Sequence, residues 1–474
     1  MASLTEGEGG IKEPAGVKAS LTEGKIGKTL AIYTLPILFS SLLLQAFTIV
    51  EALLLGAQGA ASLAAVGAVF SFISLVQSMP IAIAALFSVP VAVAVGQRDY
   101  ARLHRATHTT FTFCFLLSAS MAIVLSLLAT PLMKLISVPE DVRPDATLYF
   151  CLNNLSFIFY LTSAGGFSIL QGCGESRRPF RILVISTVAG LGLSVLLIRV
   201  LRLGVLGAGL TIVLTQFISF ILVVISLFFT TEPWRLSWRE MTLDRTVIGE
   251  TMKIALPVGF QSILYCITTT VLQSEINATG SAAAIAGYTI YSRLSGIVSR
   301  GLGAFATANQ NMVGQNLGAG KYDRIRKSTG LALLYNVIFA LLTALPITVF
   351  AAQLAGLFNS NPDVIAYASD VIYLAIPLSI AFGINEVFAR MLATLGRPRF
   401  SLGVSIISLL GVRLTWIKVA LPLLGTTATN VGWTFFLSYA ALLICDLVYY
   451  LFFPWRPPEM QLQRRPRKRK AKSA

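Results

Sequence analysis

Eight ionisable side chains lie in long apolar stretches of the kind that cross a lipid bilayer. The acids are Glu51, Glu275, Glu386 and Asp446, and the bases are Arg293, Arg300, Arg390 and Arg413. Placing one charge at the centre of a membrane helix costs at least about 3 kcal/mol, so such residues usually face a bundle interior or a water-filled cavity. These residues could carry a proton, bind a cation or contact a substrate. They could also form ion pairs, because Arg390 stands at i, i+4 from Glu386.

Glu51 is the first candidate for carrying a coupling ion, and Glu386 is the second. Glu51 lies in the run LPILFSSLLLQAFTIVEALLLG, which contains no basic residue. Burial without a partner favours the protonated form of a carboxylic acid, so Glu51 could carry a proton or coordinate sodium. Alternatively it is a solvated acid near the outer leaflet, because Gly56 and a loop follow closely.

Pro36 and Pro257 are predicted hinges. A proline inside a membrane helix removes one backbone hydrogen bond and permits a kink. Both prolines could instead simply mark the start of an apolar run.

The elements that must position these residues are membrane helices. The chain of 474 residues is 55% hydrophobic and 12% charged, whereas soluble domains are about 25% charged. Apolar runs of the length that spans a bilayer predict twelve helices. They lie near 29–55, 63–94, 107–132, 145–170, 180–200, 204–229, 254–276, 283–312, 328–357, 364–394, 401–424 and 428–453. Continuous runs exclude a barrel of alternating strands, and the prediction is an all-α integral membrane protein.

The chain also contains an internal repeat. The motif Leu-Pro-x-x-Phe-x-Ser occurs at 35–41 and again at 256–262, and Val-Gly-Gln occurs at 95–97 and at 313–315. Ordered anchors at nearly one offset predict two equivalent halves. Six crossings per half give both halves the same sense, so a pseudo-twofold axis along the membrane normal should relate the two six-helix bundles, as in many transporters. The ionisable residues do not repeat, since Glu51 aligns with Leu272.

These observations predict five regions. They are a disordered cytoplasmic tail (1–28), an N-lobe (29–229), an amphipathic cytoplasmic linker (230–253), a C-lobe (254–453) and a basic cytoplasmic tail (454–474). Most Lys and Arg residues fall in segments that are cytoplasmic if both termini are inside, as the positive-inside rule requires. The net charge of +16 therefore reflects the predicted orientation in the membrane. The sequence contains no soluble basic domain that would indicate a nucleic-acid partner.

Enzyme and metal chemistry have little support. The five cysteines form no Cys-x-x-Cys pair. His104 and His108 share a helix face, but the nearest acid, Asp99, is off the helical spacing, so an interfacial role is expected and no metal site. Phosphate loops, nucleophile elbows and carboxylate pairs are lacking, which predicts a protein that is not an enzyme and has no cofactor beyond H⁺ or Na⁺ as a coupling ion.

Several stretches resemble the multidrug and toxic compound extrusion (MATE) family of the MOP flippase superfamily. They include VLQSEINATGSAAAIAGYTIYSRL, MVGQNLGAGKYDRIRKS and the run around Glu51. The resemblance implies two six-helix lobes in a V, alternating access, and export of cationic or amphipathic organic molecules in exchange for protons or sodium. It also implies a multi-pass protein of the bacterial inner membrane, monomeric, with small organic substrates and membrane lipids as partners.

The residues that the family uses for coupling ions are only partly present in this sequence. Glu51 stands where many members have an acid, but Gly190 and Ser194 stand where the N-lobe site commonly has Asn and Asp, and Tyr265 replaces a glutamate of a sodium-coupled branch. The residues that fit a bacterial subgroup are Gln273, Arg293, Glu386 and Arg413. Glu275 has no counterpart.

Two alternatives remain open. One is a flippase for an anionic lipid or saccharide carrier, in which the membrane arginines Arg293, Arg300, Arg390 and Arg413 would contact phosphate, a group that suits guanidinium geometry. The other is a membrane receptor or enzyme without transport activity, against which the repeat and the missing catalytic motifs argue.

Overall fold

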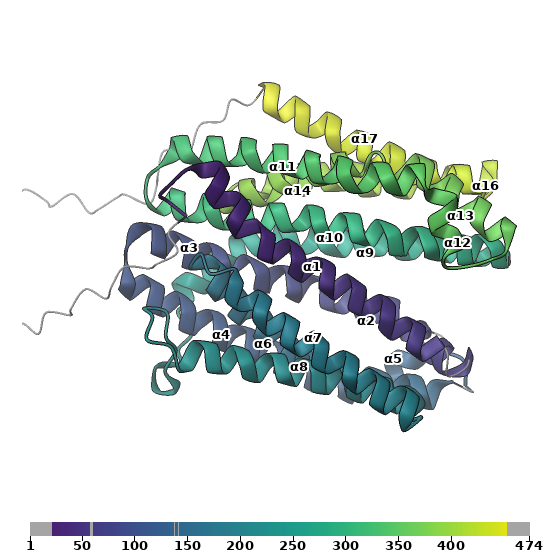
Figure 1. Cartoon of the computed structure of the whole chain (residues 1–474), viewed down its shortest axis with the longest axis horizontal. Coiled ribbons are helices and arrows are strands. Elements are labelled where there is room, and N and C mark those ends of the chain that lie inside the picture. The colour runs from purple at the N-terminus through teal and green to yellow at the C-terminus, as the bar shows by residue number, and fades with distance from the viewer. Residues whose placement is uncertain (1–20, 57–59, 137, 141, 453–474) are drawn as a thin grey trace, which may run out of the picture.

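The computed structural model describes residues 21–56, 60–136, 138–140 and 142–452, and these are almost entirely helical. Figure 1 shows two bundles of roughly aligned helices, one formed by α2 to α8 and the other by α9 to α17, with α1 running along the seam between them. The first half contains α1 (Ile26–Gly56), α2 (Ala60–Leu86), α3 (Ser88–Gln97), α4 (Tyr100–Leu127), α5 (Ala129–Leu135), α6 (Arg143–Gly172), α7 (Arg177–Ser194), the π-helix η1 (Val195–Val200) and α8 (Gly204–Phe228). The short 3₁₀ helix η2 (Trp238–Glu240) follows. The second half contains α9 (Arg245–Ala278), α10 (Ala282–Gly318), α11 (Tyr322–Val349), α12 (Ala351–Gly356), α13 (Pro362–Ala375), α14 (Ser379–Thr394), α15 (Pro398–Ser405), the π-helices η3 (Ile406–Leu414) and η4 (Trp416–Ala420), α16 (Leu421–Leu424) and α17 (Ala428–Phe452).

Several crossings are built from more than one helix. In the part of the chain that is described, nine helical spans are long and apolar enough to cross a membrane, and α13 with α14, bent by 49°, makes a tenth. The helices α6 and α10, of 30 and 37 residues, pack among these spans but are more polar. Their Asn and Gln side chains, such as Asn154 and Gln310, are buried against protein. The twelve predicted crossings are therefore all represented.

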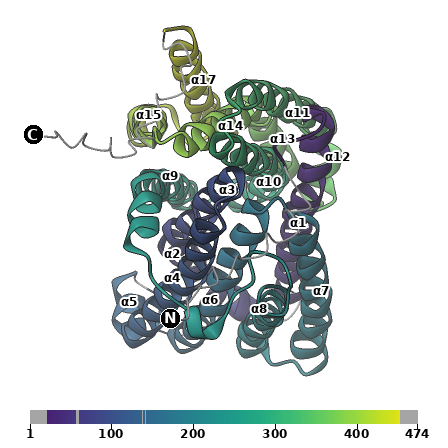
Figure 2. The ribbon, with the colours of Figure 1, turned by 90° about the vertical axis from the view of Figure 1, so that its left-hand side faces the viewer.

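The first helix of each half packs against the second crossing of the other half. The first helix, α1, packs against α7 of its own half and against α10 of the other half, while α9, which opens the second half, packs against α2 of the first. Figure 2 shows α3 beside α10 near the centre, with α9 on one flank and α1 on the other. This reciprocal contact agrees with the predicted pseudo-twofold relation.

One end of the seam is closed by a tight contact between α3 and α10. A Cβ atom at Gly96 would overlap the backbone carbonyl of Gln315, and a Cβ atom at Gly318 would overlap that of Val93. Small residues let membrane helices approach at backbone distance. We refer to this end of the molecule as the closed end.

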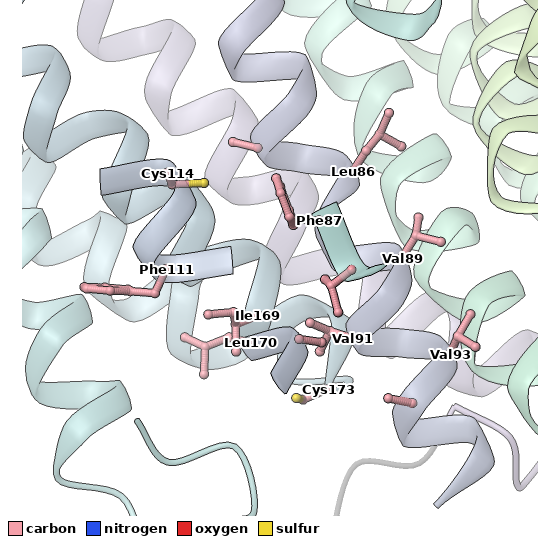
Figure 3. Close-up of a cluster of buried hydrophobic side chains, with 14 of the residues drawn as sticks. Leu86, Phe87, Val89, Val91, Val93, Phe111, Cys114, Ile169, Leu170 and Cys173 are labelled. Carbon is pink, nitrogen blue, oxygen red and sulfur yellow. The ribbon is translucent and has the colours of Figure 1, made fainter. Parts of the chain in front are cut away.

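A hydrophobic core supports α3 on its other side. Phe87, at the break between α2 and α3, and Val91 are fully buried. Figure 3 shows the side chains of α3 beside Phe111 and Cys114 of α4 and Ile169 of α6. Fixed in this core, α3 presents a rigid surface to α10.

The segment before α1 is ordered, unlike the tail predicted to reach residue 28. The backbone N–H of Leu21 donates to Oε1 of Gln315 (2.9 Å), and its carbonyl accepts from Asn316 (3.2 Å). Arg324 donates to the carbonyls of Glu23 (3.1 Å) and Gly24 (3.0 Å). The prediction was wrong from residue 21 onward because the polar ends of α10 and α11 bind this backbone. Residues 1–20 and the predicted basic tail, 454–474, lie outside the described residues.

The linker between the halves is docked on the first half. Trp234 and Leu236 are buried, and Leu236 forms a backbone hydrogen bond to Leu227 at the end of α8 (2.9 Å). Trp238 is 66% exposed and stacks on Phe228.

The last nine residues of the predicted linker are already helical, because α9 begins at Arg245. The Asp244 side chain caps α9 by accepting from the backbone N–H groups of Thr246 (2.7 Å) and Val247 (3.2 Å). These bonds, chiefly the one from Val247, hold the pKa of the Asp244 carboxyl below its ordinary value. Arg105, whose Nε lies 3.5 Å from Oδ2 of Asp244, lowers the pKa further.

Candidate functional site

A cavity of about 710 Å³ lies between the two halves. Its walls come from α2 and α6 of the first half and from α9, α10, α14, α15, η3 and α17 of the second. Leu86, the last residue of α2, lines the cavity, and α3, which packs against α10, begins two residues later at Ser88. The cavity is thus bounded below by the closed end.

A chain of polar contacts leads from the cavity lining to α3. The Glu386 carboxylate accepts from Nε of Arg390 (3.1 Å), whose Nη1 donates to Oε1 of Gln310 (3.3 Å). Nε2 of Gln310 in turn donates to Oγ of Ser88 on α3 (2.9 Å). A carboxylate in the second half is therefore connected through two side chains to the first half.

Arg300 makes a second polar contact between the halves. Its Nε donates to Oε1 of Gln45 on α1 (3.1 Å), and Gln45 is buried against Gly296. Arg300 also lines the cavity. Its guanidinium therefore bonds to a neutral amide while remaining within reach of the cavity.

Arg413 lies in an aromatic cage at the η3 side of the cavity. Its side chain is 1% exposed. The guanidinium carbon lies 4.9 Å from the ring centre of Phe435, 5.5 Å from that of Tyr439 and 5.6 Å from that of Tyr265. Nε and Nη2 donate to Oγ of Ser438 (3.1 and 2.7 Å). Nη1 has no hydrogen-bond partner among the described residues.

Asp446 of α17 lies behind the cavity wall. Its two carboxylate oxygens accept from Nδ2 of Asn385 (3.2 and 3.0 Å), and Asn385 lines the cavity. Asp446 is 6% exposed. Within the described residues it has no basic partner at ion-pair distance.

Of the other predicted site residues whose side chains are described, the structure brings only Gln273 to the same cavity. Gln273 lines the cavity and donates to Asn277 (2.8 Å). Glu275 pairs with Lys418 (2.6 Å) and is an ion pair outside the cavity lining. Arg293 is half-buried and does not line the cavity. Glu51 belongs to α1, but its side chain lies outside the described residues.

Both predicted hinges lie inside helices. Pro36 follows the start of α1 at Ile26 by several turns, and Pro257 does the same after the start of α9 at Arg245. Neither proline marks the beginning of its helix. Their role as hinges stays a prediction.

Sequence reasoning did not single out the residues that surround the charged groups. Gln45, Gln310 and Asn385 are buried amides in membrane helices, and each bonds a residue of the predicted short list. A search for amides in apolar runs would have found Gln45 and Asn385. The aromatic cage around Arg413 gives no such signal, because its members come from α9, η3 and α17.

His104 and His108 lie near Glu240, with possible ligand atoms of all three within 4.8 Å of one another. Both ring nitrogens of His108 are already engaged, however: Nδ1 lies 2.9 Å from the carbonyl of His104, and Nε2 accepts from the backbone N–H of Ser237 (3.0 Å). His104 contacts Glu240 (2.9 Å). The arrangement therefore fastens the linker to α4 and leaves His108 no nitrogen for a metal ion.

The MatE family model matches residues 36–196 and 257–417, one copy in each half. The chain belongs to the MatE family. The two matched segments begin at Pro36 and Pro257, which confirms both the repeat and the family resemblance. The all-α membrane fold with two six-helix halves is confirmed as well.

Known proteins are similar to this MatE chain over nearly its whole length. It is 22% identical to the probable multidrug resistance protein YoeA of Bacillus subtilis over 92% of this chain and 95% of that protein. It is 24% identical to the FAD transporter of Shewanella oneidensis, with coverage of 91% and 95%. A solved multidrug resistance MATE transporter of the MOP superfamily, in an outward-facing conformation, superposes with a TM-score of 0.85 at 17% identity and coverage of 92% and 97%. The last likeness concerns the fold.

Proposed function

We propose that this MatE protein is a secondary active antiporter that exports amphipathic or cationic organic molecules in exchange for protons or sodium ions. The observation that carries the proposal is a cavity between two similar halves, bounded at one end by the contact of α3 with α10. Such a cavity can be exposed alternately to either side of the membrane if the halves rock against each other. The names of relatives such as the multidrug resistance protein YoeA support export of toxic compounds.

The direction of opening follows from the predicted orientation. If both termini are cytoplasmic in the bacterial plasma membrane, the closed end faces the cytoplasm and the cavity faces the outside. Glu386, on the cavity wall, and Glu51, on α1, are the proposed coupling acids. Glu386 suits the role because protonation would release Arg390 and thereby disturb the contacts of Gln310 with the first half.

Efflux of rhodamine 123 from proteoliposomes tests the proposal, with proton and sodium gradients imposed separately. We expect Glu51→Gln to abolish efflux driven by the coupling ion and Glu386→Gln to reduce it at least about tenfold, because an amide cannot exchange a proton. Glu140→Gln, a change at an exposed acid, is the control and should leave efflux unchanged. Efflux that responds to neither gradient would refute antiport, and normal efflux by Glu51→Gln would remove Glu51 from the mechanism.

A second candidate is a flippase for an anionic lipid or saccharide carrier. The observation that favours it is the charge of the cavity lining, in which Arg300, Arg390 and Arg413 face a single carboxylate, that of Glu386, among the described residues. Dithionite quenching of fluorescent phosphatidylglycerol in proteoliposomes would detect flipping. A rate equal to that of protein-free liposomes would exclude this candidate.

A further inference from the structure

We propose that Arg413 and its aromatic cage form an anion subsite in the cavity, which takes the acidic group of an amphipathic aromatic molecule. The acidic group is a carboxylate, sulfonate or phosphate, and the aromatic body lies along the cavity toward α2. This inference rests on the proposed function, because it names the chemistry of molecules that would occupy the same cavity.

The first step of the argument is the charge of Arg413. A guanidinium stays protonated in proteins, so its positive charge persists when it is buried. Arg390 is paired with Glu386 and Lys418 is paired with Glu275, whereas Arg413 forms no ion pair with any described residue. A buried charge without a counterion is unfavourable unless a counterion can be supplied. A bound anion would supply it.

The second step concerns hydrogen bonds. Nε and Nη2 of Arg413 are directed to one acceptor, the hydroxyl of Ser438, while Nη1 has no acceptor among the described residues. Arg413 belongs to the cavity lining. A free N–H donor on a charged group favours an anionic oxygen, since charge-assisted hydrogen bonds are about twice as strong as neutral ones.

The third step concerns the rest of the cavity. Tyr265 and Tyr439 both contact the guanidinium and line the cavity, and a tyrosine hydroxyl can donate a hydrogen bond to an anion. Tyr288 and Phe382 extend the aromatic wall. Tyr160 and Phe70 continue it on the first half. Aromatic walls suit a flat apolar body, and such bodies gain from stacked or edge-on contacts.

A purely structural role for the cage is the competing explanation. Aromatic faces do attract a guanidinium, and cation–π contacts help to solvate a buried Arg. These faces carry no net charge, however, and Nη1 of Arg413 has no hydrogen-bond partner among the described residues. The two explanations make different predictions for ligands that differ only in charge.

Fluorescein and rhodamine 123 provide that comparison, because both carry a xanthene ring system while the first is anionic and the second cationic. Binding of each dye to the purified full-length protein in detergent is measured by fluorescence anisotropy without any ion gradient. We expect Arg413→Gln to weaken fluorescein binding by about tenfold or more and to change rhodamine binding by less than about twofold. Arg199→Gln removes an exposed arginine from η1, in the corresponding helix of the first half, and should change neither.

Arg413→Lys addresses the case in which the glutamine variant does not fold. It keeps the positive charge but loses the planar donor fork, so fluorescein binding should weaken several-fold while rhodamine binding stays the same. Equal loss of both dyes, or no loss of fluorescein, would overturn the anion subsite, as would a wild-type protein that does not bind fluorescein. Because binding is measured at equilibrium, a protein that binds fluorescein through Arg413 but transports nothing would refute the proposed function and keep the subsite. Proton-driven rhodamine efflux without fluorescein binding would support the proposed function and refute the subsite.

Competition assays identify the source of the anion. Dihexanoyl phosphatidylglycerol is added to the fluorescein complex in parallel with the net-neutral dihexanoyl phosphatidylcholine. Displacement by phosphatidylglycerol alone assigns the subsite to an anionic lipid headgroup. Displacement by free 1-naphthoate but by neither lipid assigns it to a soluble aromatic anion.

Discussion

At the scale of single residues, Asp446 combines burial with a neutral hydrogen-bond partner. Among the described residues, its carboxylate accepts hydrogen bonds from the Asn385 amide alone, and no base lies within ion-pair distance. Membrane acids in such surroundings often belong to proton pathways. Its neighbour Asn385 lines the cavity, so a single side chain connects the Asp446 carboxylate to the cavity.

Asp446→Asn should therefore lower proton-driven efflux at least about tenfold while leaving dye binding within about twofold, since the change removes the proton and keeps the side-chain volume. Rhodamine 123 flux and anisotropy measure the two effects separately. Asp145→Asn, at the exposed start of α6, is the matched control. Full proton-driven efflux by the Asp446→Asn protein would exclude Asp446 from coupling.

The sequence predicted which residues carry buried charges better than it predicted which partners they contact. The sequence identified Glu386, Arg390 and Arg413 as costly charges in apolar runs, and the i, i+4 spacing predicted the pair of Glu386 with Arg390. It could not predict the pair of Glu275 with Lys418, which joins residues 143 positions apart. Contacts between distant helices depend on packing, which no local pattern encodes.

At the scale of elements, one histidine of α4 helps to hold the linker on the first half. His108 is fully buried and accepts the backbone N–H of Ser237. His104 is 41% exposed and contacts Glu240, which is 57% exposed. The two histidines are thus neighbours with different energetic roles.

His108→Ala should destabilise the protein by about 1 to 3 kcal/mol, because the Ser237 N–H loses its acceptor in a buried place. His104→Ala should change stability by less than about 1 kcal/mol, since exposed ion pairs contribute little. Thermal unfolding of the detergent-solubilised proteins compares the two. Equal destabilisation would show that His108 does not hold the linker.

Element positions followed from the sequence more closely than element ends. Apolar runs placed every crossing, but the predicted start near 107 missed the first turns of α4, which begins at Tyr100. Those turns carry Arg102, His104 and Arg105, whose polar side chains contact the linker and the start of α9. Polar residues that pair with other protein segments look like loops when only hydropathy is considered.

At the scale of the whole molecule, the closed end depends on glycines in α3 and α10. Gly318→Leu would place a side chain where the Val93 backbone now lies. Since axes of packed helices lie about 8 to 10 Å apart depending on side-chain size, we expect the two helices to separate by at least about 2 Å. The closed state should then become less populated.

Spin labels at positions 98 and 321, where the exposed residues Arg98 and Lys321 stand, measure this separation by pulsed electron paramagnetic resonance. The distance distribution should move to longer values in Gly318→Leu. Gly330→Leu on α11 is the control, because nothing lies within 4 Å of a Cβ atom there. An unchanged distribution in Gly318→Leu would show that the glycine contact does not set the closed state.

The two-half architecture could be predicted because repeated motifs keep their spacing, whereas the asymmetry of the halves could not. Gly96 and Gly314 belong to the repeated Val-Gly-Gln motifs, and both lie in the contact of α3 with α10. The motifs thus mark the place where the halves meet. The first half breaks its second crossing at Phe87, whereas α10 runs without a break to Gly318.

The docked linker gives α9 the properties of a lever. Hydrogen bonds to His108 and Thr109 fasten the chain to the first half up to Asp244, so α9 departs from a fixed point. With 34 residues at roughly 1.5 Å each, the helix is about 50 Å long. A tilt of about 10° at Asp244 would then move its far end by roughly 9 Å, which is on the order of one helix diameter. A small rotation near one membrane face is thereby enlarged at the other, so widening the mouth of the cavity needs little rearrangement of the linker.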